Sequence, residues 1–351
     1  MGCYSRSLGT LHYKMQALSR SLGRRLSASS IELVDVDAVP AAYREEAIKT
    51  GYRQPPTTLA KALLSALYPV NNETVNFWTH FLPFWYFLYV LSRFVLCTGR
   101  SYEGEHYWPF VAYLLTTAAW PLTSAVAHLL HVMGDTQRHV CFFLDYLSLS
   151  WYACGAGVAY HAYSYDRAFS DSWYNALFPF LLAALCLLCT ALSCHTRLMD
   201  KSDSSRRKLY RVVAFVLPYS AVNLPLVERL LRYGIDDTPS LPWHLAMFLA
   251  SALAVLVYCL HMPERWWPGQ FDLLGNSHQV FHVLGVLCSY CQIRALQLDL
   301  EGRRQRDLLV VAGRRSAGTA LPLVALVLLA NASVVLYYTR KLRRRSARKT
   351  E

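Results

Sequence analysis

Charged residues are scarce in this sequence. Asp, Glu, Lys and Arg make up 17% of the 351 residues, whereas hydrophobic residues make up 54%. This balance is too apolar for an ordinary soluble enzyme. The first 30 residues also lack an apolar run ahead of a small-residue cleavage site, so we expect no cleavable signal peptide. No internal repeat is evident either, which argues against a transporter built from paired halves.

The net charge of +12 does not indicate nucleic-acid binding, because the Lys and Arg residues cluster beside apolar blocks. Basic residues gather at the cytoplasmic ends of membrane spans under the positive-inside rule. With a cytoplasmic N-terminus, the excess of Lys and Arg falls on the cytoplasmic side, in spite of basic residues at 303–315. The partner that this charge predicts is the lipid bilayer, and both termini are expected to be cytoplasmic.

The apolar residues fall into blocks of about 20, the length that a helix needs to cross a bilayer. The blocks are continuously apolar and do not alternate with a period of two, which favours helices over a β-barrel. The expected spans are 77–97, 107–130, 140–163, 173–194, 209–228, 241–262, 276–298 and 316–338. The fifth is the weakest, because it contains Pro218, Asn223 and Pro225. The fold class predicted is an all-α polytopic membrane protein.

These spans divide the chain into five expected parts. They are a cytoplasmic N-terminal region at 1–76, a membrane core at 77–298, an extracellular loop at 299–315, an eighth transmembrane helix at 316–338 and a basic cytoplasmic tail at 339–351. Within 1–76, the leucines and Met15 between Leu11 and Leu26 have the spacing of a basic amphipathic helix. A second, interfacial helix is predicted after Thr58 and is expected to end at Pro69.

Ionisable residues inside membrane spans are costly, so each is a functional candidate. In "NETVNFWTH" (72–80), Glu73, Asn76, Thr79 and His80 share one helical face, which we interpret as hydrogen bonding between helices. Three further places contain polar residues near span ends: Ser124 and His128 in span two, Asp145 in span three, and His278 and His282 in span seven.

These residues are predicted to lie at the same face of the membrane. Spans three to six make four crossings, so the end of span two and the starts of spans three and seven share one membrane face. His128, His278 and His282 can then meet at one depth, and three His ligands with an open fourth position describe a zinc site that retains a water. Asp145 would orient that water or accept its proton. The alternative is that the three rings are neutral and hydrogen-bonded between helices.

The motifs "NETVNFWTH", Ser124-x-x-x-His128 followed by "FLDY", and "SHQVFH" (277–282) resemble the three signature motifs of the progestin and adipoQ receptor family. "GYRQP" and "MPERWWPGQFD" resemble the membrane progestin receptor branch, most closely its gamma type. The resemblance covers residues 38–298. It implies a seven-helix, adiponectin-receptor-like core with an eighth C-terminal helix, a Zn²⁺ ion on His128, His278 and His282, and roles for Asp145 and Ser124.

The resemblance implies two functions. The first is a plasma-membrane receptor that binds a progesterone-like steroid and signals rapidly through a heterotrimeric G protein. The second is a zinc-dependent hydrolase that cleaves the amide bond of ceramide or a related sphingolipid, with Asp145 and Ser124 as catalytic residues. We expect the receptor, because the closest motif resemblance lies in that branch, and keep the hydrolase as the alternative.

Overall fold

The computed structural model describes residues 31–98, 106–165, 172–199, 203–234, 238–305 and 309–350. Nearly all of these residues are helical. The long helices in the described part are α3 (Thr74–Arg93), α4 (Trp108–Leu130), α5 (Asp135–Tyr163), α7 (Trp173–Leu198), α8 (Ser204–Tyr233), α9 (Leu241–Leu260), α10 (Ser277–Gln305) and α11 (Leu309–Thr350). Each of the eight predicted spans therefore coincides with a helix, including the fifth, which lies within α8. The all-α polytopic fold class is confirmed.

Six of these helices are long and apolar enough to cross a membrane: Thr74–Cys97, Trp108–Met133, Trp173–Leu198, Ser205–Tyr233, Leu241–Leu260 and Thr319–Arg348, within the residues that the structure describes. The chain is thus a multi-pass membrane protein. The expected spans 140–163 and 276–298 lie in α5 and α10, which do not meet the same measure of apolarity. Both helices carry polar side chains in their interior, and α5 buries several small and polar residues, from Ser148 to Ala162.

The helices extend beyond the predicted span ends. Helix α10 continues to Gln305 and α11 begins at Leu309, so much of the segment expected as a loop at 299–315 is helical. Helix α11 then continues to Thr350, through the expected tail. Leaving the apolar layer does not end a helix when the following residues are Leu, Glu, Arg and Lys, all of which favour helical conformation.

The chain forms two compact units. Unit 1 comprises residues 1–82, 124–141 and 248–288, and unit 2 comprises residues 83–123, 142–247 and 289–351. Five helices, α3, α4, α5, α9 and α10, contribute residues to both units.

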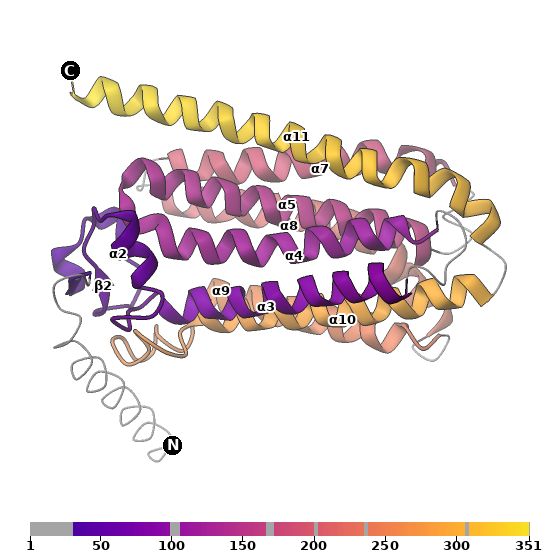
Figure 1. Ribbon diagram of the computed structural model, residues 1–351, viewed down its shortest axis with the longest axis horizontal. Coiled ribbons are helices and arrows are strands. Elements are labelled where there is room, and N and C mark those ends of the chain that lie inside the picture. The colour runs from indigo at the N-terminus through magenta and orange to yellow at the C-terminus, as the bar shows by residue number, and fades with distance from the viewer. Residues whose placement is uncertain are drawn as a thin grey trace, which may run out of the picture. The chain divides into compact units, whose positions relative to one another are not determined.

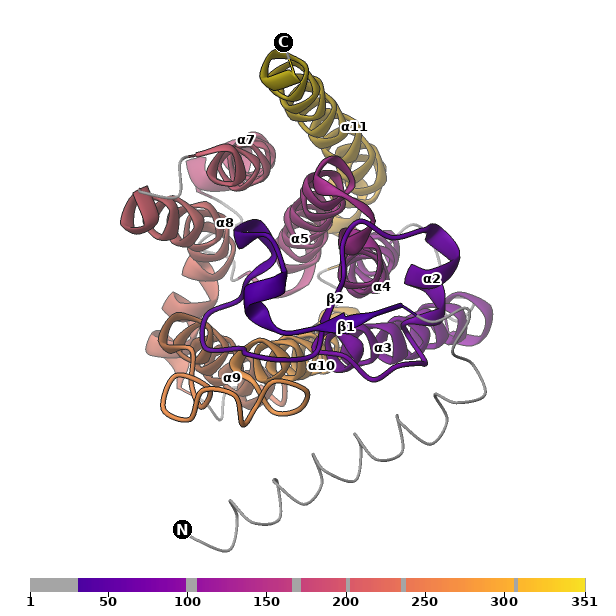
Figure 2. The same cartoon turned by 90° about the vertical axis from the view of Figure 1, so that its left-hand side faces the viewer.

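Unit 1 contains the described N-terminal residues, which form a small two-stranded sheet with short helices (Figure 2). The elements are β1 (Leu33–Val34), η1 (Val36–Ala38), η2 (Ala41–Tyr43), β2 (Tyr52–Arg53), α2 (Leu59–Leu64) and η5 (His131–Met133). The strands pair antiparallel, with Leu33 opposite Arg53 and Val34 opposite Tyr52. Val39, Tyr43, Ile48 and Tyr52 form a hydrophobic cluster beneath them.

The predicted helix after Thr58 is present as α2, but it ends at Leu64 and not at Pro69. The Thr58 hydroxyl accepts a hydrogen bond from the Lys61 amide, so Thr58 is the N-cap. The apolar side chains Leu59, Leu63 and Leu67 are 50%, 51% and 68% exposed, which suits the expected position at a membrane interface. The predicted amphipathic helix between Leu11 and Leu26 lies outside the described residues.

Unit 2 contains α7, α8 and α11 and most of α5. Helix α7 packs against both α8 and α11, and Figure 1 shows α7 and α11 side by side. Helix α5 approaches α4 closely at Gly155, where an added Cβ would lie 2.0 Å from the Thr116 hydroxyl oxygen. Only glycine permits this packing. A short π-helix, η3 (Phe94–Thr98), follows α3.

Candidate metal centre

Arg53 caps the helix that carries His128. Strand β2 directs the buried Arg53 side chain to the end of α4, where it donates hydrogen bonds to the carbonyl oxygens of His128 (2.5 Å) and Leu129 (2.9 Å). It also donates to the Ser65 hydroxyl at 2.9 Å. Burial lowers the pKa of Arg53 to about 10, so the guanidinium keeps its charge at neutral pH. A cation at a helix C-terminus satisfies carbonyls that have no partner within the helix.

Two sets of hydrogen bonds fix the N-terminus of α10. The Asn276 side chain accepts a hydrogen bond from the Gln279 amide at 3.0 Å, and the Gln279 side chain accepts one from the Gly275 amide. This reciprocal pattern acts like a capping box. The buried Glu264 carboxylate accepts a hydrogen bond from the Ser277 amide at 2.7 Å, which places a negative charge at the positive end of the helix dipole. The first turn of α10 therefore has a defined orientation.

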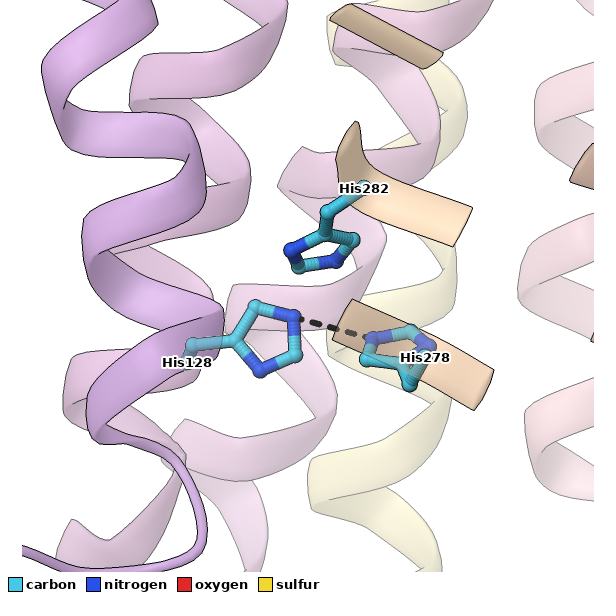
Figure 3. Close-up of side chains that lie close together, drawn as sticks. All are labelled: His128, His278 and His282. Atoms are coloured by element: carbon cyan, nitrogen blue, oxygen red, sulfur yellow. Dashed lines mark hydrogen bonds between the residues drawn. The ribbon is translucent and has the colours of Figure 1, made fainter. Parts of the chain in front are cut away.

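Three histidines converge where these two helix ends meet in unit 1 (Figure 3). Their candidate ligand atoms all lie within 4.8 Å of one another. Nε2 of His128 and Nε2 of His278 are 3.2 Å apart, and the ring centroids of His278 and His282 are 4.5 Å apart. His128 and His282 are buried, and His278 is partly buried.

Side chains from α3 and the residue before it orient two of the rings. Oε2 of Glu73 lies 2.7 Å from Nδ1 of His128, and the Thr79 hydroxyl lies 3.1 Å from Nδ1 of His282. Because Thr79 also bonds to the Val75 carbonyl, its hydroxyl oxygen can accept from His282. Protons on Nδ1 of both rings leave their Nε2 lone pairs to face the cluster. His80 stacks on His282 with ring centroids 3.6 Å apart.

This set of donors fits a zinc ion. Two nitrogens that bind one tetrahedral Zn²⁺ lie about 3.3 Å apart, given Zn–N bonds of about 2.0–2.1 Å, and the His128–His278 separation is 3.2 Å. Imidazole nitrogens suit Zn²⁺, and a carboxylate bonded to the second nitrogen of a ligating ring is the usual outer support. Three histidines would leave one coordination position open.

The other two predicted site residues, Ser124 and Asp145, belong to different units. Ser124 is buried on α4, one turn before His128, and belongs to unit 1. Asp145 lies on α5 in unit 2, where its carbonyl accepts a hydrogen bond from the Ser148 hydroxyl. The carboxylate that contacts a cluster histidine within unit 1 is Glu73. The sequence interpretation had given Glu73 only a hydrogen bond between helices, and it did not single out Arg53.

Unit 2 contains a buried ionic cluster that sequence reasoning missed. Asp299 on α10 lies 2.9 Å from Nε2 of His244 and 3.3 Å from Nη1 of Arg229, and it accepts a hydrogen bond from the Ser240 hydroxyl at 2.5 Å. The sequence analysis gave none of these residues a role, because residues on α8, α9 and α10 are distant in sequence. Arg229 and Asp299 directly follow the expected spans 209–228 and 276–298, so the signal available was one charge of each sign at a span end.

Comparison with known proteins identifies the chain's relatives. The family model described as haemolysin-III related matches residues 68–293. Membrane progestin receptor gamma of Mus musculus is 34% identical over 80% of this chain and 85% of its own length. Membrane progestin receptor delta of Homo sapiens is 36% identical over 80% of this chain and 82% of its own length, and membrane progestin receptor alpha of Sus scrofa is 31% identical over 77% of each.

The predicted resemblance is therefore confirmed: the gamma types are 32–34% identical to this chain and the delta types 34–36% identical. The matched region contains α3 to α9 and the part of α10 that carries His278 and His282. The chain belongs to the haemolysin-III-related family, within its branch of membrane progestin receptors.

Proposed function

We propose that this protein is a plasma-membrane receptor for progesterone-like steroids that signals through a heterotrimeric G protein. The observation that carries this proposal is the shared naming of the relatives as membrane progestin receptors, with 31–36% identity over at least 77% of the chain. A steroid is a rigid apolar body, and an aromatic-rich helical bundle can bury it without any proton transfer.

The proposal includes a Zn²⁺ ion held by His128, His278 and His282. Bound there, zinc would supply positive charge and an open coordination position for water. The residues of unit 1 supply the rest: Glu73 and Thr79 orient two rings, and Arg53 and Asn276 secure the helix ends that carry them. In this role, His128 on α4 and His278 and His282 on α10 would be linked through the ion. Both termini are proposed to be cytoplasmic.

The alternative is a zinc-dependent ceramidase, which the comparisons do not favour. The two functions differ in what they require of Asp145. Amide hydrolysis needs a side chain that accepts or donates a proton near the nucleophilic water, whereas steroid burial does not. Asp145→Asn keeps the size of the side chain and removes its ability to take a proton.

The experiment measures saturable binding of radiolabelled progesterone and release of fatty acid from ceramide on the same membranes. We expect wild type and Asp145→Asn to bind progesterone within a few-fold of each other, and neither to release fatty acid above the level of empty membranes. Asp37→Asn, an exposed carboxylate in unit 1, is the matched control. Ceramide turnover by wild type that falls together with binding in Asp145→Asn would contradict the receptor assignment.

A further inference from the structure

A groove of about 220 Å³ lies in unit 2 between the last turns of α3 and the C-terminal part of α10. It is lined by Tyr89, Val90, Arg93, Phe94, Gln297, Leu300 and Glu301. Apolar and aromatic side chains form much of its wall, and one residue of each charge lies at its edge. The groove is separate from the histidine cluster, which belongs to unit 1.

The two charged residues in the groove do not neutralise each other. Arg93 and Glu301 are both exposed. Among the described residues, neither makes an ion pair or hydrogen bond with the other or with a third side chain. Opposite charges that share one groove and remain separate can each bind a different end of a ligand that carries both charges.

Both residues lie where a span leaves the apolar layer. Arg93 is in the last turn of α3, inside the candidate span Thr74–Cys97, and Glu301 follows the expected span 276–298 by three residues. Long charged side chains near span ends extend toward the polar head groups of the bilayer. Tyr89, which is 60% exposed, adds an amphipathic ring of the kind that is enriched at this level.

We propose that this groove binds the head group of a zwitterionic phospholipid. Arg93 receives the phosphate, to which a guanidinium donates paired hydrogen bonds. Glu301 faces the ammonium group, and the Tyr89 ring offers it a cation–π surface. Val90, which is partly exposed, contacts the start of the acyl chains. The Glu301 carboxylate would repel the head group of a purely anionic lipid. An uncharged diacylglycerol would leave both Arg93 and Glu301 without a charged partner.

The test is native mass spectrometry of the full chain in detergent, titrated with phosphatidylcholine, phosphatidylglycerol or diacylglycerol of equal acyl length. The variants are Arg93→Gln, Arg93→Lys and Glu301→Gln. The control is Arg232→Gln, which removes an exposed charge paired with Glu228 on α8. The thermal unfolding midpoint of each variant shows whether it is folded.

We expect wild type and Arg232→Gln to bind phosphatidylcholine more tightly than the other two lipids. Arg93→Gln and Glu301→Gln should each weaken phosphatidylcholine binding about tenfold, the loss of one charge-assisted contact. Arg93→Lys should bind phosphatidylcholine between wild type and Arg93→Gln, because the ammonium keeps the charge but cannot donate the paired hydrogen bonds. Glu301→Gln should strengthen phosphatidylglycerol binding. Equal binding of phosphatidylcholine and diacylglycerol, or tighter phosphatidylcholine binding by Glu301→Gln, would overturn the proposal.

Discussion

Oε2 of Glu73 lies 2.7 Å from Nδ1 of His128, and Oε1 of the same carboxylate lies 3.1 Å from Nε2 of His131. One partly buried carboxylate thus orients two histidines, one in the last turn of α4 and one in η5 directly after it. Because Nδ1 of His128 faces Glu73, its Nε2 faces His278 on α10. The tautomer of the central ring is set by a residue that precedes α3, 55 positions earlier in the chain.

Replacing Glu73 by Gln should weaken zinc binding without removing a ligand. The amide keeps the size of the carboxylate but can present a donor to Nδ1, which no longer favours the required tautomer. We expect a loss of about 10- to 100-fold in zinc affinity, measured by competition with a chelator of known strength. Glu46→Gln, at an exposed carboxylate 3.9 Å from His261, should change nothing. Equal losses in both variants would contradict the role of Glu73.

Alanine at His128, His278 or His282 should remove most of the bound zinc, since two remaining imidazoles and water hold the ion weakly. The measurement is the zinc content of protein purified without chelator, by elemental analysis. His161→Ala is the control, because His161 lies on α5 in unit 2, next to Asn175. Wild-type protein with well below one zinc per chain would refute the metal site.

Arg53→Lys should destabilise unit 1 although it preserves the charge. A single ammonium cannot reach the carbonyls of His128 and Leu129 and the Ser65 hydroxyl together, as the guanidinium does. We expect a loss of about 2–3 kcal/mol in the free energy of unfolding, measured by denaturation in mixed micelles. Arg44→Lys, a partly exposed arginine, should cost less than about 1 kcal/mol. A similar cost for both substitutions would argue against the capping role.

The N-terminal part of unit 1 should loosen in alkali. Burial raises the pKa of Tyr52 to about 12 from its ordinary value of 10.0. A raised folded-state pKa contributes stability below pH 10 that is lost as the pH rises from about 10 to about 12. Over this range, the stability of wild type relative to Tyr52→Phe should fall by about 2–3 kcal/mol. Unfolding curves at several pH values measure it, and a difference that is constant with pH would be contrary evidence.

Asp299→Asn should be the most destabilising carboxylate substitution that we consider in unit 2. It leaves Arg229 largely buried without its counter-charge and weakens the bond to His244. Breaking a buried pair in this way costs about 3–5 kcal/mol. Glu228→Gln breaks a partly exposed pair with Arg232 and should cost much less. Comparable unfolding midpoints for the two variants would rule out a stabilising role for the cluster.

The sequence was sufficient to predict the helices and the three histidines. Blocks of about 20 apolar residues are long enough to indicate membrane helices without further context, and all eight expected spans coincide with helices of the structure. The histidines could be related to one another because an even number of crossings returns the chain to the same face. That argument needs only the number of spans, and it depended on the fifth, which α8 now supplies.

The surroundings of the histidines were less accessible to sequence reasoning. Arg53 follows no periodic pattern, and its role depends on a two-residue strand that directs it to the end of α4. The carboxylate expected to support the site was Asp145, chosen because it lies near a span start. That role, which acts on a zinc-bound water, stays a prediction. The carboxylate that contacts the His128 ring is Glu73, whose position depends on where α3 begins. Contacts between residues far apart in the chain, such as His244 and Asp299, cannot be recognised from local sequence patterns.

The contact between Thr50 and Asp272 has a consequence for biosynthesis. The Asp272 carboxylate accepts hydrogen bonds from both the amide and the hydroxyl of Thr50, across 222 positions of the chain. A ribosome adds about 5–20 residues per second, so at least about ten seconds separate the synthesis of Thr50 from that of Asp272. Six long helices of the described part, α3 to α9, are made in that interval. During that interval Thr50 lacks the two hydrogen bonds that the Asp272 carboxylate later accepts. Nascent chains that end before residue 272 should therefore be degraded faster than those that extend past it.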